Sequence, residues 1–234
     1  MATLYFRLST VDYLLMNTTH ILSFLSDLQA NNEKAWMDAH RDRYQTARQH
    51  FIDLVGHILG ELSIDDESLR GLRPKDCIFR INRDIRFSKD KSPYKNNFGA
   101  AMAEGGKKTD QAMYYMHLQP NGESFLAGGI YQPPPPILAK VRQEIDYNAS
   151  ELKTITDAPA FKQHFGTIQG DALKRAPKGY EPDHPNIELL KLKSYLVMHK
   201  LTDKQMTNEQ FPATAVKVFQ SMQPFLNYLN VAVS

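Results

Sequence analysis

The stretch from Cys77 to Lys95 carries the residue types that bind phosphate or carboxylate groups. Its polar side chains, counted at every second position, are Arg80, Asn82, Asp84 and Arg86. The lysines that follow are Lys89, Lys91 and Lys95, with Tyr94 directly before the last. Arginine presents a planar fork of N–H donors that matches a phosphate or carboxylate, and lysine adds a point charge. The composition of this stretch therefore predicts an anion-binding site.

The same stretch alternates between apolar and polar residues, which predicts the element that positions the charges. The apolar positions are Cys77, Phe79, Ile81, Ile85 and Phe87. A period of two is typical of a β-strand with one buried face. We therefore expect a strand over residues 77–88, with polar neighbours about 7 Å apart on its exposed face. The alternative role for its lysines is to protect a solvated edge strand from pairing with another sheet.

Arg83 breaks the alternation, because it falls on the apolar side of the expected strand. Either a bulge at Arg83 and Asp84 restores the pattern, or the Arg83 guanidinium is buried and paired. We favour a structural role for Arg83, since an isolated buried charge is costly and has to be satisfied.

His117 and Asp84 are the candidates for proton transfer. By alternation His117 shares a strand face with Tyr115. The hairpin that contains them is expected to lie near the polar residues from Arg80 to Arg86. Histidine changes its charge near neutral pH and can act as a general base. The alternative, which we favour without further geometry, is a histidine held in the sheet by hydrogen bonds.

Other chemistries fit the sequence poorly. Ser88 and Ser92 each begin a Ser-x-x-Lys pattern, but Pro93 and the lysines favour a loop over the buried helix that such a nucleophile requires. The histidines lack the spacing of a metal site, and Cys77 is the only cysteine. We therefore predict neither a metal nor a cofactor.

Composition describes an ordinary globular protein with one basic region. The chain has 234 residues, of which 42% are hydrophobic and 23% charged. It has no run of 18 apolar residues, so we expect no membrane-spanning helix and no membrane partner. The single cysteine excludes an internal disulfide and predicts an inert buried thiol in a cytoplasmic protein. Net charge is +2, but residues 70–108 contain eleven Lys or Arg against four Asp or Glu, which predicts an anionic partner for that region.

Hydrophobic periodicity predicts helices at both ends of the chain and strands between them. The expected helices cover residues 21–28, a long segment from Asn31-Asn32 to about residue 62, and residues 137–148, 159–165 and 211–229. The expected strands, besides residues 77–88, cover residues 98–103, 112–119 and 124–131. Residues 187–199 predict a short helix followed by a strand.

Asn121-Gly122 lies between two of these strand patterns and is a strong signal for a β-hairpin. Gly128-Gly129, inside the second arm, predicts a bulge or a close approach of the backbone. The fold class is therefore α+β, a single domain with a central antiparallel sheet packed by N-terminal, middle and C-terminal helices. We place this domain at residues 17–234 and an N-terminal extension at residues 1–16.

Several segments match one known family. They are the run from Phe79 to Lys95, Asn31-Asn32 with Trp36, Tyr114 to Leu118, Gly128-Gly129 and Pro177 to Tyr180. On these segments the chain resembles the domain of unknown function 2461 family, a group of conserved hypothetical proteins of bacteria and fungi. The resemblance spans residues 20–225 and implies a single domain. It carries over no reaction, cofactor or catalytic residue.

Three functions fit these residues. The leading hypothesis is a cytoplasmic binding or regulatory domain with a site for an anion, either a phosphorylated small molecule or a nucleic-acid segment. An enzyme acting on a phosphate ester or nucleotide, with His117 and Asp84 in proton transfer, is the second. The third is an interaction module for an acidic partner. The expected ligand-binding residues are Arg80, Asn82, Arg86, Lys89, Lys91, Lys95, Tyr94 and Tyr115, and Tyr131 is a further ring on which a base can stack. The oligomeric state stays open.

Overall fold

The fold is α+β, as predicted, in a computed structural model that describes residues 17–234. The predicted N-terminal extension, residues 1–16, lies outside the described residues. The helices are α2 (Thr18–Ala30), α3 (Lys34–Ala39), α4 (Arg41–Asp65), α5 (Pro74–Cys77), α6 (Pro135–Asp157), α7 (Pro159–Phe165), α8 (Ile187–Leu190), α9 (Asp203–Met206) and α10 (Phe211–Val233). The strands are β1 (Phe98–Met102), β2 (Met113–Leu118), β3 (Ser124–Ile130) and β4 (Tyr195–Leu201).

Within residues 17–234 the strands form one four-stranded antiparallel sheet in the order β1-β2-β3-β4. The predicted hairpin joins β2 to β3, and Asn121 and Gly122 in its connection both have positive φ, at 69° and 74°. Short extended segments pair with both borders of the sheet. Ile78 pairs with Ala100 of β1, and Gln169 pairs with Leu196 of β4.

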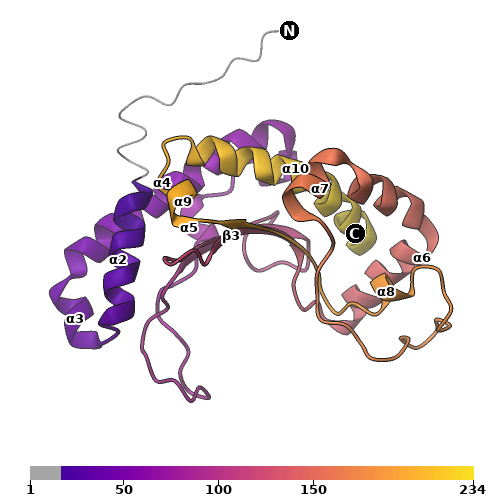
Figure 1. Cartoon of the computed structure of the whole chain (residues 1–234), viewed down its shortest axis with the longest axis horizontal. Coiled ribbons are helices and arrows are strands. Elements are labelled where there is room, and N and C mark those ends of the chain that lie inside the picture. The colour runs from indigo at the N-terminus through magenta and orange to yellow at the C-terminus, as the bar shows by residue number, and fades with distance from the viewer. Residues whose placement is uncertain (1–16) are drawn as a thin grey trace, which may run out of the picture.

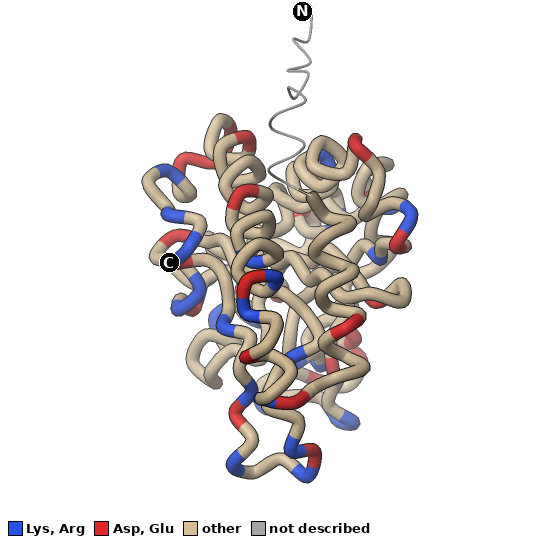
Figure 2. Tube along the Cα trace, turned by 90° about the vertical axis from the view of Figure 1, so that its left-hand side faces the viewer, with Lys and Arg blue, Asp and Glu red and all other residues tan. Residues whose placement is uncertain are grey.

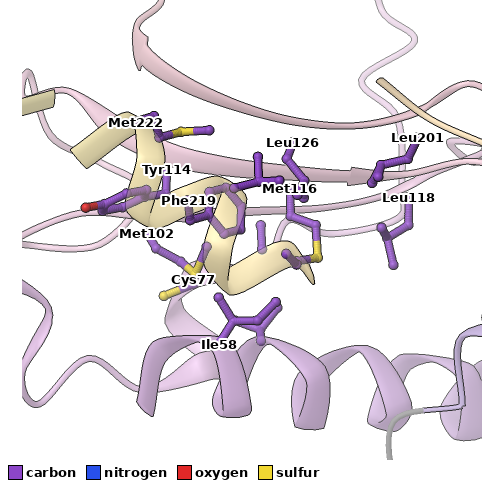
Figure 3. Packing of buried hydrophobic residues seen from close by; sticks show 14 of the residues in the cluster. Ile58, Cys77, Met102, Tyr114, Met116, Leu118, Leu126, Leu201, Phe219 and Met222 are labelled. Atoms are coloured by element: carbon purple, nitrogen blue, oxygen red, sulfur yellow. The ribbon is translucent and has the colours of Figure 1, made fainter. Parts of the chain in front are cut away.

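One face of the sheet is covered by helices (Figure 1). Alternate residues of β2, Tyr114, Met116 and Leu118, are buried against the side occupied by α4 and α10, where Ile58 and Phe219 meet them (Figure 3). The helices contribute apolar stripes of the kind their periodicity predicts. The other alternate residues of β2 point away from this core and are half-buried. The second face of the sheet is therefore free to carry polar chemistry.

Two adjacent glycines in β3 allow close contacts with α10 and with β4. A Cβ on Gly128 would lie 2.4 Å from the sulfur of Met222, so its absence lets α10 pack on β3. Gly129 has φ +128°, and a Cβ there would lie 1.9 Å from the backbone oxygen of Tyr195. The register continues through Gly129 opposite Leu196 without interruption, so these glycines mark a close backbone approach and not a bulge.

Two predicted helices differ from the observed ones in their limits. The long helix expected from Asn31-Asn32 is divided into α3 and α4 at His40, whose φ and ψ are not helical. The helix expected to stop at residue 148 continues to Asp157, with one non-helical residue, Asn148. The expected helix-then-strand at residues 187–199 is confirmed as α8 and β4. No helix among residues 17–234 has both the length and the apolar character needed to cross a membrane.

The strand predicted over residues 77–88 is wrong. Cys77 ends α5, and beyond the single pairing of Ile78 the chain leaves the sheet as a projecting loop, residues 78–97. This loop lies opposite α4 and α10, and its lysines, arginines and aspartates gather at the bottom of Figure 2. Phe87 is 95% exposed, although a strand would bury it. Cys77 is buried as expected, and burial raises the pKa of its thiol to about 11.

Candidate functional site

The base of the projecting loop is held by Asn32, from the turn between α2 and α3. Its side-chain N–H group donates to the backbone oxygen of Tyr94 and to the side-chain oxygen of Asn96, both at 3.0 Å. The Tyr94 N–H donates in return to the Asn32 side-chain oxygen at 3.0 Å. Asn82 pairs with Tyr94 by its backbone, which closes the loop on itself. The loop is therefore anchored at its base by a side chain and a backbone pair.

Arg83 holds the inside of the loop. Its guanidinium pairs with Asp90 and donates to the backbone oxygen of Ser92 at 3.2 Å and to the hydroxyl of Ser88 at 3.3 Å. The side chain is 25% exposed, so it is paired as expected but only partly buried. Hydrogen bonds from Ser92 and the Arg83 charge lower the pKa of Asp90 to about 2. Arg83 therefore acts as a structural cross-link, and its charge is neutralised within the loop.

A pocket of about 250 Å³, here called the loop pocket, opens beside this anchor. Its walls are Asn32, Arg83, Asp90, Ser92, Tyr94, Lys95, Asn96, Asn97 and Gln119. Lys95 is partly buried and lies 5.5 Å from the ring centroid of Phe79, and no carboxylate among residues 17–234 pairs with it. Burial, followed by the charge of Arg80, lowers the pKa of Lys95. The pocket thus combines a partly desolvated cation with side-chain amides.

The sheet face that no described helix covers carries His117 beside this pocket. Its Nε2 lies 3.1 Å from the side-chain oxygen of Gln119, and its Nδ1 lies 3.2 Å from the Tyr115 hydroxyl and 3.4 Å from the Asn97 side-chain nitrogen. This arrangement fits a neutral ring that donates from Nε2 and accepts at Nδ1. Burial is the main cause that lowers the pKa of His117, which also favours the neutral ring.

A second pocket of about 180 Å³, here called the sheet pocket, lies on the same face. Its lining residues are His117, Gln119, Gly122, Glu123, Ser124, Phe125, Met198 and Lys200. Gln119 lines both pockets, so they are neighbours. The His117 ring lies parallel to the ring of Phe125, with centroids 4.5 Å apart and planes inclined by 10°.

The predicted site residues do not all come together. Lys95 and Tyr94 line the loop pocket, but the Tyr94 ring is buried and offers no free face for stacking. Tyr115 and His117 lie side by side on the sheet. The remaining predicted ligand residues line neither pocket and lie on the exposed loop, namely Arg80, Asn82, Arg86, Lys89 and Lys91.

Asp84 and His117 make their hydrogen bonds to different partners. Asp84 accepts two bonds from the guanidinium of Arg86, at 2.9 and 2.6 Å, and this pairing lowers the pKa of Asp84. His117 bonds to Tyr115, Asn97 and Gln119 as described above. The proton-transfer pair expected from the sequence is therefore not assembled. Tyr131 is exposed beyond the end of β3 and lines neither pocket.

Sequence reasoning missed several residues of these pockets. Phe125 and Lys200 had a detectable signal, since alternation along their strands places them on the same face as His117. Asn97 and Gln119 had none, because a lone amide belongs to no recognisable pattern, and Asn32 was noted only at a helix start and in the family resemblance. Among residues 17–234 no three His, Cys, Asp or Glu side chains group in a way that could hold a metal ion.

Comparison with known proteins gives a family and no activity. A family model described as "Conserved hypothetical protein (DUF2461)" matches residues 20–228, a range that includes the projecting loop and every residue of the two pockets. No curated protein and no solved structure matches the chain. The match covers most of the chain and agrees with the resemblance found in its sequence. The chain therefore belongs to the DUF2461 family of conserved hypothetical proteins.

Proposed function

We propose that this protein binds a small phosphorylated ligand in the loop pocket, as a binding or regulatory domain. The observation that carries the proposal is Lys95, a partly buried ammonium group in the pocket wall that no described carboxylate pairs with. Removing a charge from water is costly unless a counter-charge compensates it. An anion in the pocket would supply that counter-charge.

Neighbouring groups support an anion over a cation. Asn96, Asn97 and Gln119 add side-chain amides that can donate to phosphate oxygens. The pocket's carboxylate, Asp90, is already engaged by Arg83 and Ser92. Arg80, exposed nearby, forms no salt bridge among the described residues, and its charge acts on Lys95 and adds to the positive potential.

The test is a thermal-shift and calorimetric titration with phosphate, pyrophosphate and a panel of sugar phosphates. A ligand that binds only the folded protein stabilises it by mass action and so raises the unfolding midpoint. At a ligand concentration of a hundred times Kd, the free energy of unfolding rises by about 2.7 kcal/mol. Lys95→Met keeps the apolar stem beside Phe79 and removes the charge, so it should weaken binding about tenfold or more. Lys89→Met, on the exposed part of the loop, is the matched control and should bind as the wild type does. Equal losses in both variants, or no binding by any compound in the panel, would contradict the proposal.

The exposed part of the projecting loop supports a second candidate function, an interaction with an acidic partner. Phe87 is 95% exposed there, and the exposed Lys89 and Lys91 follow it in the chain. Large exposed apolar side chains beside charges are common where proteins meet. Replacing Phe87, Lys89 and Lys91 with serine should abolish capture of such a partner and leave phosphate binding intact.

We place both activities in the cytoplasm, because the single thiol, Cys77, is free.

A further inference from the structure

We infer that the ligand of this site is a nucleotide, with its phosphate in the loop pocket and its base in the sheet pocket. The inference rests on the proposed function, since it takes the phosphate site as given. What it adds is the chemistry of the second group on the same ligand. That chemistry follows from the aromatic side chains on the open sheet face.

Four rings, here called the aromatic row, are in contact across this face: Phe79 contacts Tyr115, and Tyr115, His117 and Phe125 contact one another. Phe79, from the loop, lies 6.2 Å from Tyr115, measured between ring centroids, and Tyr115 lies 6.1 Å from His117. His117 in turn stacks on Phe125 at 4.5 Å. The last three project from adjacent strands, because His117 of β2 is directly opposite Phe125 of β3. The row is half-buried except for Phe79, which is 37% exposed.

A cation stands at each end of the row. Lys95 lies over Phe79 at one end, and Lys200 is the cross-strand partner of Phe125 at the other. Lys200 is exposed and, like Lys95, has no carboxylate partner among residues 17–234. Aromatic faces bordered by unpaired cations are the features by which proteins hold bases and their phosphates. A ligand that is only anionic would leave this row unused.

The sheet pocket also offers both kinds of hydrogen-bonding group that a base edge needs. Glu123 provides an acceptor for an exocyclic amine, and Lys200 provides a donor for a carbonyl or ring nitrogen. The Ser124 hydroxyl is engaged with the backbone of Gln119. It accepts from the Gln119 backbone N–H and donates to the Gln119 backbone oxygen. Because Gln119 lines both pockets, they are adjacent, and the inferred ligand would reach from one to the other past Gln119.

The charge distribution favours a nucleotide over a nucleic-acid strand. Arg83 and Arg86 are neutralised by Asp90 and Asp84, and Glu123 adds negative charge beside the aromatic row. A strand would need a longer track of free cations along its backbone. Two flanking lysines suit the few charges of a mononucleotide.

The experiment is calorimetric titration of the whole protein with pyrophosphate, ribose 5-phosphate and the four ribonucleoside 5′-monophosphates. At least one mononucleotide should bind about tenfold or more tightly than ribose 5-phosphate, which is the size of effect that stacking of one base produces. Saturation-transfer NMR on the wild-type protein should show stronger contact with base protons than with ribose protons. This readout needs no substitution.

Phe125→Leu keeps an apolar side chain and removes the ring, so it should reduce nucleotide affinity to that of ribose 5-phosphate and leave pyrophosphate binding unchanged. Phe87→Leu, on the exposed loop, is the control and should change neither. Nucleotides that bind no better than ribose 5-phosphate would overturn the inference and leave the proposed function standing. If pyrophosphate also fails to bind, the proposed function falls with it. A single-stranded oligonucleotide that binds more tightly, with affinity falling steeply as salt rises, would replace the nucleotide with a strand.

Discussion

Asn32 and Tyr94 lie 62 positions apart in the chain, yet the Asn32 side chain pairs with both backbone polar groups of Tyr94, at 3.0 Å each. An amide side chain offers one face with a donor and an acceptor, as a peptide group of a neighbouring strand does. The turn between α2 and α3 thereby holds one wall of the loop pocket in place.

Asn32→Ala should lower the free energy of unfolding by about 1–3 kcal/mol, because it leaves partly buried backbone groups of Tyr94 without partners. Urea denaturation measures this loss, and amide hydrogen exchange should show faster exchange at Tyr94. Asn31→Ala is the neighbouring control, since the Asn31 side chain makes an exposed hydrogen bond to Asp27. A loss from Asn31→Ala as large as that from Asn32→Ala would contradict the role of the anchor.

Arg83→Ala should loosen the projecting loop without unfolding the domain. It removes the links to Asp90, Ser92 and Ser88 from a side chain that is only partly buried. Chymotrypsin should then cut after Phe87 several-fold faster, while the thermal midpoint changes little. Arg73→Ala, which breaks the exposed pair with Asp76, should leave the cutting rate unchanged. Equal rates in the wild type and Arg83→Ala would show that the cross-link does not order the loop.

Gly129→Ala should destabilise the protein by about 2–4 kcal/mol, because the new Cβ would meet the backbone oxygen of Tyr195 at 1.9 Å and φ is +128°. Gly60→Ala should do the reverse. Gly60 lies in α4 with nothing within 4 Å of a Cβ, so alanine should add up to about 1 kcal/mol through helix propensity. Chemical denaturation of both variants checks the opposite signs, and an alanine tolerated at Gly129 would refute the close approach.

Stability should fall as pH drops below about 6.5, the ordinary pKa of histidine in an unfolded chain. Burial lowers the pKa of His117, His20 and His164 in the folded state, so the unfolded chain binds more protons in that range. Their contribution is fully present above pH 6.5 and is lost as acid favours the unfolded, protonated chain.

His117→Gln should therefore flatten the dependence of unfolding free energy on pH between 7.5 and 5, by at most about 1.4 kcal/mol per pH unit for one proton. Asp90 and Asp157, whose pKa values are lowered to about 2, contribute their losses only at more acid pH. Urea titrations at half-unit steps supply the measurement. A variant with the slope of the wild type would mean that His117 is not the neutral group described here.

The parts of the fold that were predicted correctly are determined by residues close together in the sequence. Asn121-Gly122 specifies its turn locally, and the hairpin formed as expected. The segment from Cys77 to Phe87 was mispredicted as a strand. Its alternation of apolar and polar residues indicates which side chains are buried, but it does not indicate whether a partner strand is present. Cys77 and Ile81 are buried as a strand would bury them, but Cys77 lies at the end of α5 and Ile81 lies in the projecting loop.

The candidate site was predictable only in part, for a related physical reason. Charge density identified the projecting loop, and Lys95 within it does line a pocket. Arg86, Lys89 and Lys91 line neither pocket, and the sequence did not separate them from Lys95, because nothing in a linear run of cations distinguishes the base of a loop from its exposed end. The pairing of Asn32 with Tyr94 depends on how the chain returns on itself, and a single residue type does not encode it.

The segments at the two borders of the sheet have a consequence for polymerisation. Ile78 pairs with Ala100 and Phe79 donates its N–H to Gly99 at one border, and Gln169 exchanges hydrogen bonds with Leu196 at the other. The chain thus serves as its own blocking strand at the middle of β1 and near the start of β4, where an incoming copy would otherwise begin a fibril or a swapped dimer. The lysines of the projecting loop are therefore released from guarding a sheet edge, and their charge is left for a ligand or partner.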